Sequence, residues 1–291
     1  MTVLVDKSTK VLVTGVTGRE GTTHTLSMLK YGTNVVAGVT PGKGGEKVDR
    51  VPVYNSVRQA FSEHPDINAS IVFVPAAYTG DSVYEAIDSG IKLIVAITEH
   101  VPVHDSLQFI NYARDKGVTI IGPNCPGLIS PEETKVGIMP GHIFSKGDIG
   151  MVSRSGTLTY EIAWVLTRAG CGQSTAVGIG GDPVIGKDVL EIVDMFENDP
   201  KTRALVVIGE IGGDAEERLA ARIKQRGLKK PIVSFIAGRQ APPGKRMGHA
   251  GAIISMGAGT AASKIAALED AGVRVAELPS EIPRLLRESL N

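Results

Sequence analysis

The sequence predicts an α/β protein with two domains, each built on a mostly parallel sheet that helices cover on both faces. Apolar, β-branched runs alternate with amphipathic segments along the whole chain, a pattern typical of parallel strands that are buried on both sides. Glycine is frequent, at 35 residues, and aromatic residues make up only 4%, which suits many glycine turns at strand ends. The length of 291 residues is sufficient for two domains with a core in each.

The first half of the chain alternates regularly between strands and helices. Its strands are apolar runs, and two of its amphipathic segments end on Gly90 and Gly117, as helices commonly do. The expected strands are 10–16, 34–39, 69–77, 91–98 and 118–124, and the expected helices are 22–30, 81–90 and 103–117.

The second half repeats this alternation after a segment of different composition. Residues 122–148 are rich in Pro and Gly and have no helical period, which indicates a domain boundary. We therefore expect one domain over 1–124 and another over 125–291. The expected strands are 150–153, 174–180, 204–212, 231–237 and 273–278, and the expected helices are 157–167, 188–197, 215–225 and 261–271.

The composition limits the partners and the compartment. The net charge is zero, so neither a nucleic acid nor a membrane surface is indicated as a partner. Two cysteines, Cys125 and Cys171, give no disulfide framework and favour a reducing compartment. No apolar run has membrane-spanning length, and the N-terminus leads almost directly into a strand without room for a targeting peptide. We expect a cytoplasmic protein.

A glycine loop follows the first expected strand. In "GVTGREGTTH", Gly15, Gly18 and Gly21 lie where the strand ends and the first helix begins. Glycines there let the backbone approach a phosphate, and the helix N-terminus favours its negative charge. The spacing predicts a phosphate-bearing ligand, although a merely tight turn would give the same pattern. No Lys-Ser/Thr pair follows, so this is not a Walker loop.

The end of the second expected strand narrows the choice of ligand. An NAD site has an acidic residue there to bind the ribose diol, whereas this strand ends in "GVTPGKGGEK" and offers Lys43 instead. A cation suits a phosphate on the ribose, which leaves NADP or coenzyme A. The alternative is an ordinary solvated lysine in a loop.

Most of the histidines give no clear signal. His100 and His104 are four residues apart, as in a helical metal pair, but Pro102 between them breaks that geometry, so we expect no metal site. His142 stands in the Pro- and Gly-rich segment, and the sequence does not decide whether it has a function.

His249 is different because of its surroundings. It lies in "GKRMGHAGA", after a buried strand, and therefore at the carboxyl end of a parallel sheet, where α/β proteins bind ligands. Lys245 and Arg246 add positive charge, so this histidine is placed to meet an anion. A flexible glycine loop with an incidental histidine is the alternative.

Two further loops point to the same chemistry. In "VSRSGTLTYE", Ser155 is a natural N-cap, and Gly156 and Thr157 would expose free amides at a helix N-terminus, which makes a phosphate site. Glu210 ends a buried strand and could hold one ring nitrogen of a histidine, or it could be a solvated loop acid. A nucleophile, an orienting carboxylate and a phosphate site together suit a phosphohistidine intermediate.

In this order, the motifs resemble the α subunits of succinyl-CoA synthetase (succinate–CoA ligase) along essentially the whole chain. The resemblance implies a Rossmann-like CoA-binding domain followed by a flavodoxin-like parallel-sheet domain that carries the phosphohistidine loop. Several specific motifs in one order are a far stronger signal than a single glycine loop. The matching segments are "TGREG", "GVTPGKGG", "AITE", "IGPNCPG", "VSRSGTLTYE", "GIGGDP", "IGEIGG" and "GKRMGHAGAI".

The resemblance also assigns roles to single residues. It implies that His249 is transiently phosphorylated, that Glu210 is its carboxylate partner and that Tyr160 contacts the acid substrate. The turn "TGREG" differs from the family pattern at Arg19 and Glu20, which is tolerable where only backbone amides touch the phosphates. The residues implied to bind CoA are Thr17, Gly18, Arg19, Glu20, Lys43, Ile97, Thr98 and Glu99.

The implied enzyme forms succinyl-CoA reversibly from succinate and CoA with ATP or GTP, in the tricarboxylic acid cycle. The phosphoryl group passes from the nucleotide to His249 and then to succinate, and the CoA thiol attacks the resulting acyl phosphate. Because the chain has no Walker loop, the nucleotide site has to come from elsewhere. The resemblance implies a β subunit with an ATP-grasp fold that binds most of the nucleotide and its Mg, in an αβ or α2β2 assembly.

Other functions remain open on the sequence alone. A malate–CoA ligase would share the same architecture, and the preference for ATP or GTP is not encoded in this chain. An NADP-dependent dehydrogenase would explain the first domain but would leave "GKRMGHAGA" and Glu210 without a role. A CoA- or nucleotide-sensing module would need no nucleophilic histidine.

Overall fold

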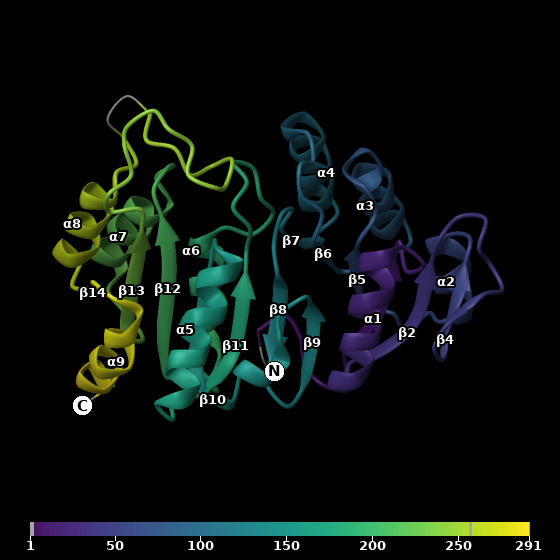
Figure 1. Ribbon diagram of the computed structural model, residues 1–291, viewed down its shortest axis with the longest axis horizontal. Coiled ribbons are helices and arrows are strands. Elements are labelled where there is room, and N and C mark those ends of the chain that lie inside the picture. The colour runs from purple at the N-terminus through teal and green to yellow at the C-terminus, as the bar shows by residue number, and fades with distance from the viewer. Residues whose placement is uncertain (1–2, 256–257, 291) are drawn as a thin grey trace.

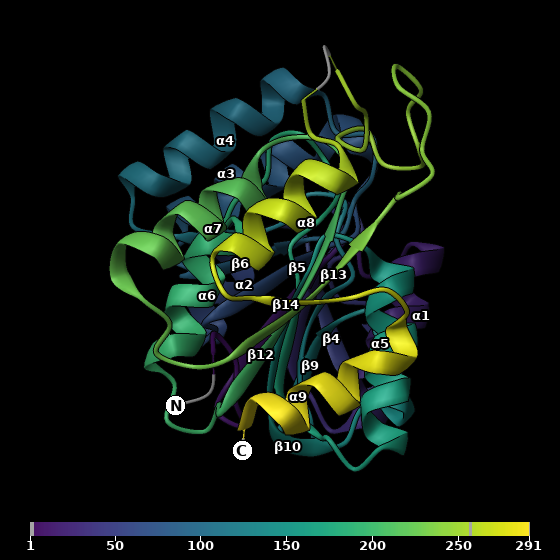
Figure 2. The same cartoon turned by 90° about the vertical axis from the view of Figure 1, so that its left-hand side faces the viewer.

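The computed structural model describes residues 3–255 and 258–290 and confirms the α/β class. Two sheets lie side by side, and each has helices on both faces (Figure 1). Figure 2 shows the view from the side: α6, α7 and α8 cover one face of the second sheet, and α5 and α9 cover the other.

The first sheet has the strand order of a Rossmann fold. Its order is β3-β4-β2-β1-β5-β6-β7, and β1, β2, β4, β5, β6 and β7 are parallel in the arrangement 3-2-1-4-5-6. The strands are β1 (Lys10–Thr14), β2 (Asn34–Val39), β3 (Lys47–Val48), β4 (Val51–Tyr54), β5 (Ala69–Val72), β6 (Leu93–Ala96) and β7 (Thr119–Ile121). The helices are α1 (Arg19–Tyr31), α2 (Val57–Glu63), α3 (Thr79–Asp88) and α4 (Val103–Asp115).

The second sheet has the flavodoxin-like order that the family resemblance implies. Its order is β14-β13-β12-β10-β11-β8-β9, in which β10 to β14 are parallel in the arrangement 2-1-3-4-5. The strands are β8 (Gly127–Ser130), β9 (Thr134–Gly137), β10 (Lys146–Ser153), β11 (Gln173–Gly178), β12 (Ala204–Glu210), β13 (Ile232–Ala237) and β14 (Arg274–Ala276). The helices are α5 (Gly156–Arg168), α6 (Val189–Asn198), α7 (Ala215–Arg226), α8 (Ala261–Asp270) and α9 (Ile282–Leu290).

Several elements differ from the expectation. The expected strand 69–77 is too long, because β5 ends at Val72 and the 3-10 turn Ala76–Tyr78 follows Pro75. The hairpin β3–β4 and the helix α9 were not expected. The segment 122–148 is also more ordered than its composition indicates, since the hairpin β8–β9 pairs antiparallel with β11 and extends the second sheet.

The hairpin β8–β9 is the edge of the second sheet that faces the first domain, where β9 packs against α1 (Figure 1). One cluster of buried apolar residues includes Val13 of β1, Leu128 of β8 and Val177 of β11, so the core is continuous from the first sheet into the second. Apolar burial of this kind is the main stabilising contribution to the contact between the domains.

Lys135 of β9 is a buried cation in this contact. Its side chain is 2% exposed, and its Nζ donates a hydrogen bond of 2.8 Å to Oγ of Ser27 on α1. The same Nζ lies 5.8 Å from the centre of the Tyr31 ring. Burial lowers the pKa of Lys135 to about 8, because the charged form loses its water.

We predict that Lys135→Met stabilises the protein at neutral pH. The unfolded chain binds a proton at Lys135 up to a pKa near 10.5, while the folded chain releases it near 8, so the charged lysine opposes folding below about pH 8 and this penalty fades as the pH rises to 10.5. We expect a gain of about 1–2 kcal/mol at pH 7, because loss of the Ser27 hydrogen bond offsets part of the benefit.

Urea unfolding of both proteins at pH 7 and pH 10 checks this prediction. The difference between them should shrink at the higher pH. Lys146→Met removes an exposed lysine at the start of β10 and is the control, with little effect at either pH. An equal difference between wild type and Lys135→Met at both pH values would contradict the assigned cause.

Candidate active site

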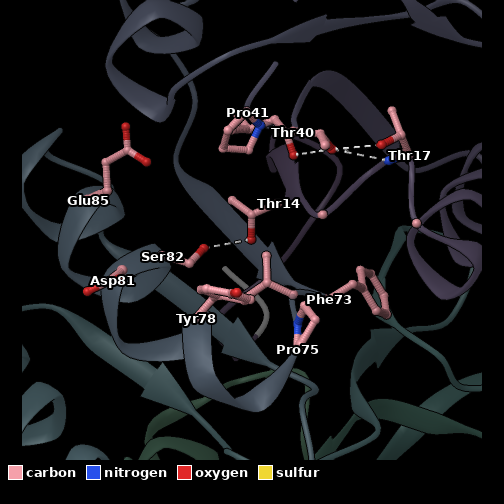
Figure 3. Close-up of a pocket in the computed structure, with 14 residues that line it drawn as sticks. Thr14, Thr17, Thr40, Pro41, Phe73, Pro75, Tyr78, Asp81, Ser82 and Glu85 are labelled. Carbon is pink, nitrogen blue, oxygen red and sulfur yellow. Dashed lines mark hydrogen bonds between the residues drawn. The ribbon is translucent and has the colours of Figure 1, made fainter. Parts of the chain in front are cut away.

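The first pocket lies at the carboxyl edge of the first sheet, between β1 and β5, where the strand order reverses. Such switch points are the usual ligand sites of open α/β sheets. The pocket has a volume of about 550 Å³ and is drawn in Figure 3. Its lining residues are Thr14, Gly15, Thr17, Gly18, Val39, Thr40, Pro41, Phe73, Val74, Pro75, Tyr78, Asp81, Ser82 and Glu85.

The glycine loop brings the start of α1 close to this pocket. A Cβ added at Gly21 would lie 2.1 Å from the carbonyl oxygen of Gly15, so only glycine lets the helix begin so near the strand. Gly15 has φ +76°, a conformation that favours glycine. The N-cap Gly18 provides no side-chain hydrogen bond to the helix, so the first amides of α1 stay available for an anion.

Six of the eight residues expected to bind CoA are distributed over two neighbouring pockets, and Arg19 and Lys43 line neither of them. Thr17 and Gly18 line the first pocket. Glu20, Ile97, Thr98 and Glu99 line a second one of about 270 Å³, together with His24, Phe73, Val74 and Ile138. The side chains of Arg19 and Lys43 are exposed, and Nζ of Lys43 lies 3.0 Å from Oε1 of Glu46.

A third pocket continues this series into the second domain. It has a volume of about 400 Å³ and its lining includes Glu99, Asp182, Arg246 and His249. Phe73 is shared by the first and second pockets, and Glu99 by the second and third. The three pockets are therefore neighbours, from the switch point of the first sheet to His249.

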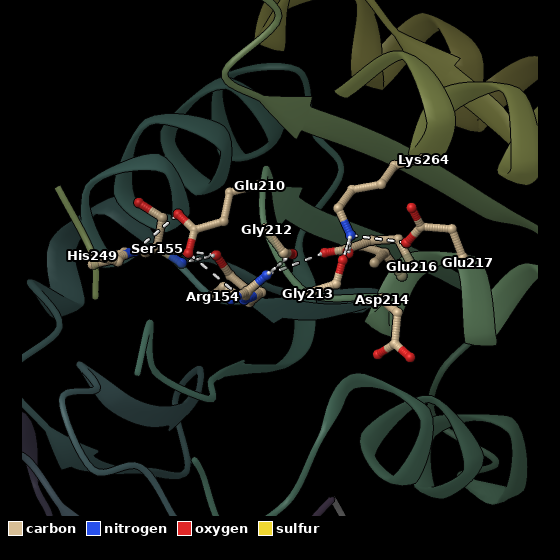
Figure 4. Close-up of polar contacts among 12 residues, drawn as sticks. Arg154, Ser155, Glu210, Gly212, Gly213, Asp214, Glu216, Glu217, His249 and Lys264 are labelled. Atoms are coloured by element: carbon tan, nitrogen blue, oxygen red, sulfur yellow. Dashed lines mark hydrogen bonds and ion pairs between the residues drawn. The ribbon is translucent and has the colours of Figure 1, made fainter. Parts of the chain in front are cut away.

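His249 and Glu210 are in direct contact. Nδ1 of His249 lies 2.9 Å from both carboxylate oxygens of Glu210, which is the last residue of β12 and is 6% exposed (Figure 4). A Cβ added at Gly181 would lie 2.2 Å from Cγ of His249, so the ring packs directly on that glycine. With Nδ1 used by Glu210, Nε2 is the ring nitrogen that remains for chemistry.

The charges around His249 shift its pKa. The hydrogen bond to Glu210 raises the pKa of His249, and burial opposes it. Two weaker effects follow, because Arg154 lowers this pKa and Asp182 raises it. Arg154 follows β10 and lies 3.6 Å, measured from Nε, from Oε1 of Glu210.

The expected phosphate site is at the start of α5. Ser155 is the N-cap, and its Oγ accepts a hydrogen bond of 3.4 Å from the amide of Leu158. Gly156 begins the helix, and Thr157 is exposed in the first turn. This N-terminus follows β10, so it lies with Glu210 of β12 at the point where the order of the second sheet reverses.

Tyr160 lies one turn into α5, and its hydroxyl is close to the helix start. A Cβ added at Gly156 would lie 3.9 Å from this hydroxyl and 3.7 Å from Cβ of Pro126. Burial raises the pKa of Tyr160 to about 12, so it is a neutral hydrogen-bond donor at neutral pH. Tyr160 is not among the residues that line the pocket of His249.

Sequence reasoning missed two residues of this site. Arg154 stands in the quoted "VSRSG" directly after a buried strand, and Asp182 stands in "GGDP", where its Oδ1 accepts a 2.8 Å hydrogen bond from Nδ2 of Asn124. A charge immediately after a buried strand was the available signal in the first case. His100 and His142 are exposed.

Two family models place the chain in a class of protein in which a CoA-binding domain precedes a CoA-ligase domain. Residues 6–100 match the model of the CoA binding domain, and residues 152–274 match the CoA-ligase model. No helix in the described ranges 3–255 and 258–290 has the length and apolar character to cross a membrane.

Curated relatives define the family more closely. The chain is 57% identical over 290 residues to succinate–CoA ligase [ADP-forming] subunit alpha 2 of Archaeoglobus fulgidus, covering 100% of both chains. It is 57% identical over 288 residues to the corresponding alpha subunit of Methanothermobacter thermautotrophicus, covering 99% of this chain and 97% of that one. The chain belongs to the family of succinate–CoA ligase alpha subunits.

Solved structures show the same fold at lower identity. ATP citrate lyase of Methanosaeta concilii, in complex with (3S)-citryl-CoA, matches 99% of this chain with a TM-score of 0.90 and 24% identity. The dinucleotide-forming acetyl-coenzyme A synthetase 1 of Ca. Korarchaeum cryptofilum matches 93% with a TM-score of 0.73 and 22% identity. This chain spans 50% and 58% of the lengths of those two chains.

We predict that Gly181→Ala displaces the ring of His249 from Glu210. The added methyl group would meet Cγ at 2.2 Å, which no small adjustment relieves. Since Glu210 is the main cause of the raised pKa of His249, that pKa should fall towards its ordinary value. NMR titration of His249 measures the change, and an unaltered midpoint would contradict the contact.

Gly80→Ala is the matched control for this substitution. There the added methyl group meets only the Tyr84 ring, at 4.0 Å, in α3 of the other domain. The midpoint of His249 should stay unchanged in this variant.

Proposed function

We propose that this chain is the alpha subunit of a succinate–CoA ligase and that it forms succinyl-CoA through a phosphorylated His249. The observation that carries the proposal is the contact of both Glu210 oxygens with Nδ1 of His249, which leaves Nε2 as the ring nitrogen available for chemistry. Membership of the family supports succinate and CoA as the substrates. The geometry supports the intermediate.

The first step is phosphorylation of His249. Nε2 of the neutral imidazole attacks the terminal phosphorus of ATP or GTP, the P–N bond forms, and the bond to the nucleoside diphosphate breaks. The proton on Nδ1 stays between the ring and Glu210, whose carboxylate stabilises the cationic ring. The amides at the start of α5, at Gly156 and Thr157, stabilise the phosphoryl oxygens.

Two further transfers complete the reaction. A carboxylate oxygen of succinate attacks phosphorus, so the P–N bond breaks and succinyl phosphate leaves His249 neutral again. The thiolate of CoA then attacks the acyl carbon, the thioester forms, and inorganic phosphate leaves with the electron pair of the C–O bond. Tyr160 is proposed to contact the acid substrate as a neutral donor.

We propose that CoA lies along the three neighbouring pockets, with its thiol towards His249. In this proposal the nucleotide portion occupies the pocket at the switch point, with its phosphates at Thr17, Gly18 and the amides of Arg19 and Glu20. The pantetheine arm then passes Ile97, Thr98 and Glu99 and brings the thiol to the third pocket. We assign this role to a first domain of residues 1–124, and the phosphohistidine chemistry to 125–291.

A partner is needed for the nucleotide. The alpha-subunit family implies a beta subunit, and the sequence of this chain contains no Walker loop. We propose that the beta subunit has an ATP-grasp fold, binds ATP or GTP with Mg, and forms an αβ or α2β2 assembly with this chain. Two free cysteines support a cytoplasmic location.

Labelling with γ-³²P-nucleotide tests the function directly. We expect the complex of this chain with its beta subunit to acquire a label that acid removes and alkali does not, as befits a P–N bond. His249→Asn should lose both the label and succinyl-CoA formation, because the amide is not a nucleophile. This chain alone should bind CoA without becoming labelled. Normal turnover by His249→Asn would refute the proposal.

We predict a modest contribution of Lys43 to CoA binding through the 3′-phosphate. Its side chain is 51% exposed and already paired with Glu46, and exposed ion pairs contribute only about 0.2–1 kcal/mol. Wild type should therefore bind CoA about two- to fivefold more tightly than dephospho-CoA, and less so at high salt.

The comparison of two ligands on two proteins isolates this contact. Calorimetry should show that Lys43→Ala binds CoA and dephospho-CoA almost equally. Lys47→Ala, an exposed lysine on β3, is the control and should retain the preference. Equal weakening of both ligands by Lys43→Ala would place the lysine on another part of CoA.

A further inference from the structure

Arg154 lies directly behind the carboxylate that holds His249. It follows β10, is 8% exposed, and its Nε lies 3.6 Å from Oε1 of Glu210 (Figure 4). Its Nη1 donates a hydrogen bond of 3.2 Å to the carbonyl oxygen of Gly212 in the loop after β12. A buried guanidinium with these partners is fixed in position, because its planar fork must meet several acceptors at once.

The loop that carries His249 also packs on this guanidinium. A Cβ added at Gly251 would lie 2.9 Å from Nη2 of Arg154, so the chain two residues after His249 passes directly over it. The amide of Gly251 donates a hydrogen bond of 3.1 Å to Gly181, the glycine under the histidine ring. Arg154 thus touches the segments that position both members of the Glu210–His249 pair.

Further buried charges lie on the other side of Arg154. Its Nη1 is 3.9 Å from Oε1 of Glu216, and Oε2 of Glu216 is 2.6 Å from Nζ of Lys264. Both side chains are fully buried, and Lys264 also contacts Glu217 at 2.8 Å. Figure 4 shows Glu210, Arg154, Glu216 and Lys264 in one row of alternating charge.

Such a row costs free energy of desolvation, and apolar side chains of similar size would stabilise the domain equally well or better. Oε1 of Glu216 has no hydrogen bond within the described part of the chain, so the row is not optimised for stability alone. The first charge in this row is the carboxylate of Glu210, which contacts His249. The buried charges can therefore act on the histidine.

We propose that Arg154 is a positioning residue of the phosphohistidine site, which fixes the orientation of Glu210 and offsets part of its charge, so that more of His249 is neutral and reactive at Nε2. The proposal deepens the function proposed above and rests on it. Arg154 acts through Glu210, and Glu216 and Lys264 hold Arg154 in place from behind.

Arg154 is needed in this role because of the other charges around His249. Glu210 at the end of β12 and Asp182 in the loop after β11 both favour the imidazolium, which has no free electron pair for attack on phosphorus. Arg154 opposes them from beneath the site. The other charged or titratable groups that line this pocket are Glu99 and His100 from the loop after β6 and Arg246 from the loop of His249 itself.

The test uses the complex with the beta subunit and three variants. Arg154→Met removes the positive charge, and Arg154→Lys keeps the charge but loses the planar guanidinium. Arg203→Met is the control, because within the described residues this surface arginine forms an ion pair with Asp148 alone. Three quantities are measured: the NMR titration midpoint of His249, the rate of its phosphorylation from pH 6 to pH 9, and CoA binding.

We expect Arg154→Met to raise the titration midpoint of His249 by about one unit. Phosphorylation at pH 7 should slow by roughly 10- to 100-fold, the loss usual when a partner that orients an imidazole is disturbed, and should recover partly at pH 9. Arg154→Lys should restore the midpoint but only part of the rate. CoA binding should be unchanged in all variants, and Arg203→Met should match wild type throughout.

An unchanged midpoint in Arg154→Met, or the same loss of rate at every pH, would overturn the proposal, because a merely structural role predicts that result. If Arg154→Met does not fold, Arg154→Lys decides: a retained midpoint with a reduced rate supports the proposal, and a wild-type rate overturns it. If wild type takes up no phosphoryl group while Arg154→Met shifts the midpoint, the proposed function fails and the positioning of His249 by Arg154 stands.

Discussion

The contact between Nδ1 of His249 and Glu210 is the interaction on which the geometry of the candidate site depends. Glu210 is the last residue of β12 and pairs in register with Ala237, the last residue of β13. The sheet therefore fixes the carboxylate, and the long segment after β13 has to return across the sheet edge to bring His249 to it. A rigid strand end holds one partner, and a loop carries the other.

Close packing of backbone makes this return possible. A Cβ at Gly212 would lie 2.0 Å from the carbonyl oxygen of Gly251, and a Cβ at Gly181 would lie 2.2 Å from the ring of His249. Three loops, after β11, β12 and β13, thus approach one another closely at glycines, and the side chains of Arg154 and His249 pack against these glycines. In the sequence these glycines look like ordinary turn residues. Only the contacts between the loops show that a larger residue would not fit at these positions.

The sequence was sufficient for the parts of the fold that carry a local signal. The apolar runs predicted β2 and β12 closely, and Ser155 before "GTLTYE" predicted the N-cap of α5. The hairpin β8–β9 has short strands in a Pro- and Gly-rich segment, so its pairing with β11 depends on the tertiary structure. Lys135 and Lys264 are buried against the usual tendency of lysine, which composition cannot reveal.

The pair of His249 and Glu210 could be proposed from sequence because each follows a buried parallel strand, and such strand ends share one edge of a sheet. Arg154 meets the same criterion, but a single arginine in a loop is more often solvated, and only the distances show that it is buried behind Glu210. In the first domain the motif "AITE" gave Ile97, Thr98 and Glu99, but the position of Phe73 in two neighbouring pockets depends on the fold and has no sequence signal.

The electrostatics of the third pocket explain why the proposed intermediate requires a second chain. Glu99 and Asp182 line the pocket of His249, and both repel a phosphate, whereas Arg154 offsets the charge of Glu210 on the Nδ1 side of the ring. The N-terminus of α5 supplies the equivalent of about half a positive charge, and Arg246 is exposed in a glycine loop. Since a phosphoryl group carries nearly two negative charges, the described part of this chain does not balance it. A partner that brings further positive potential to Nε2 would complete the site, and the same partner would bring the nucleotide.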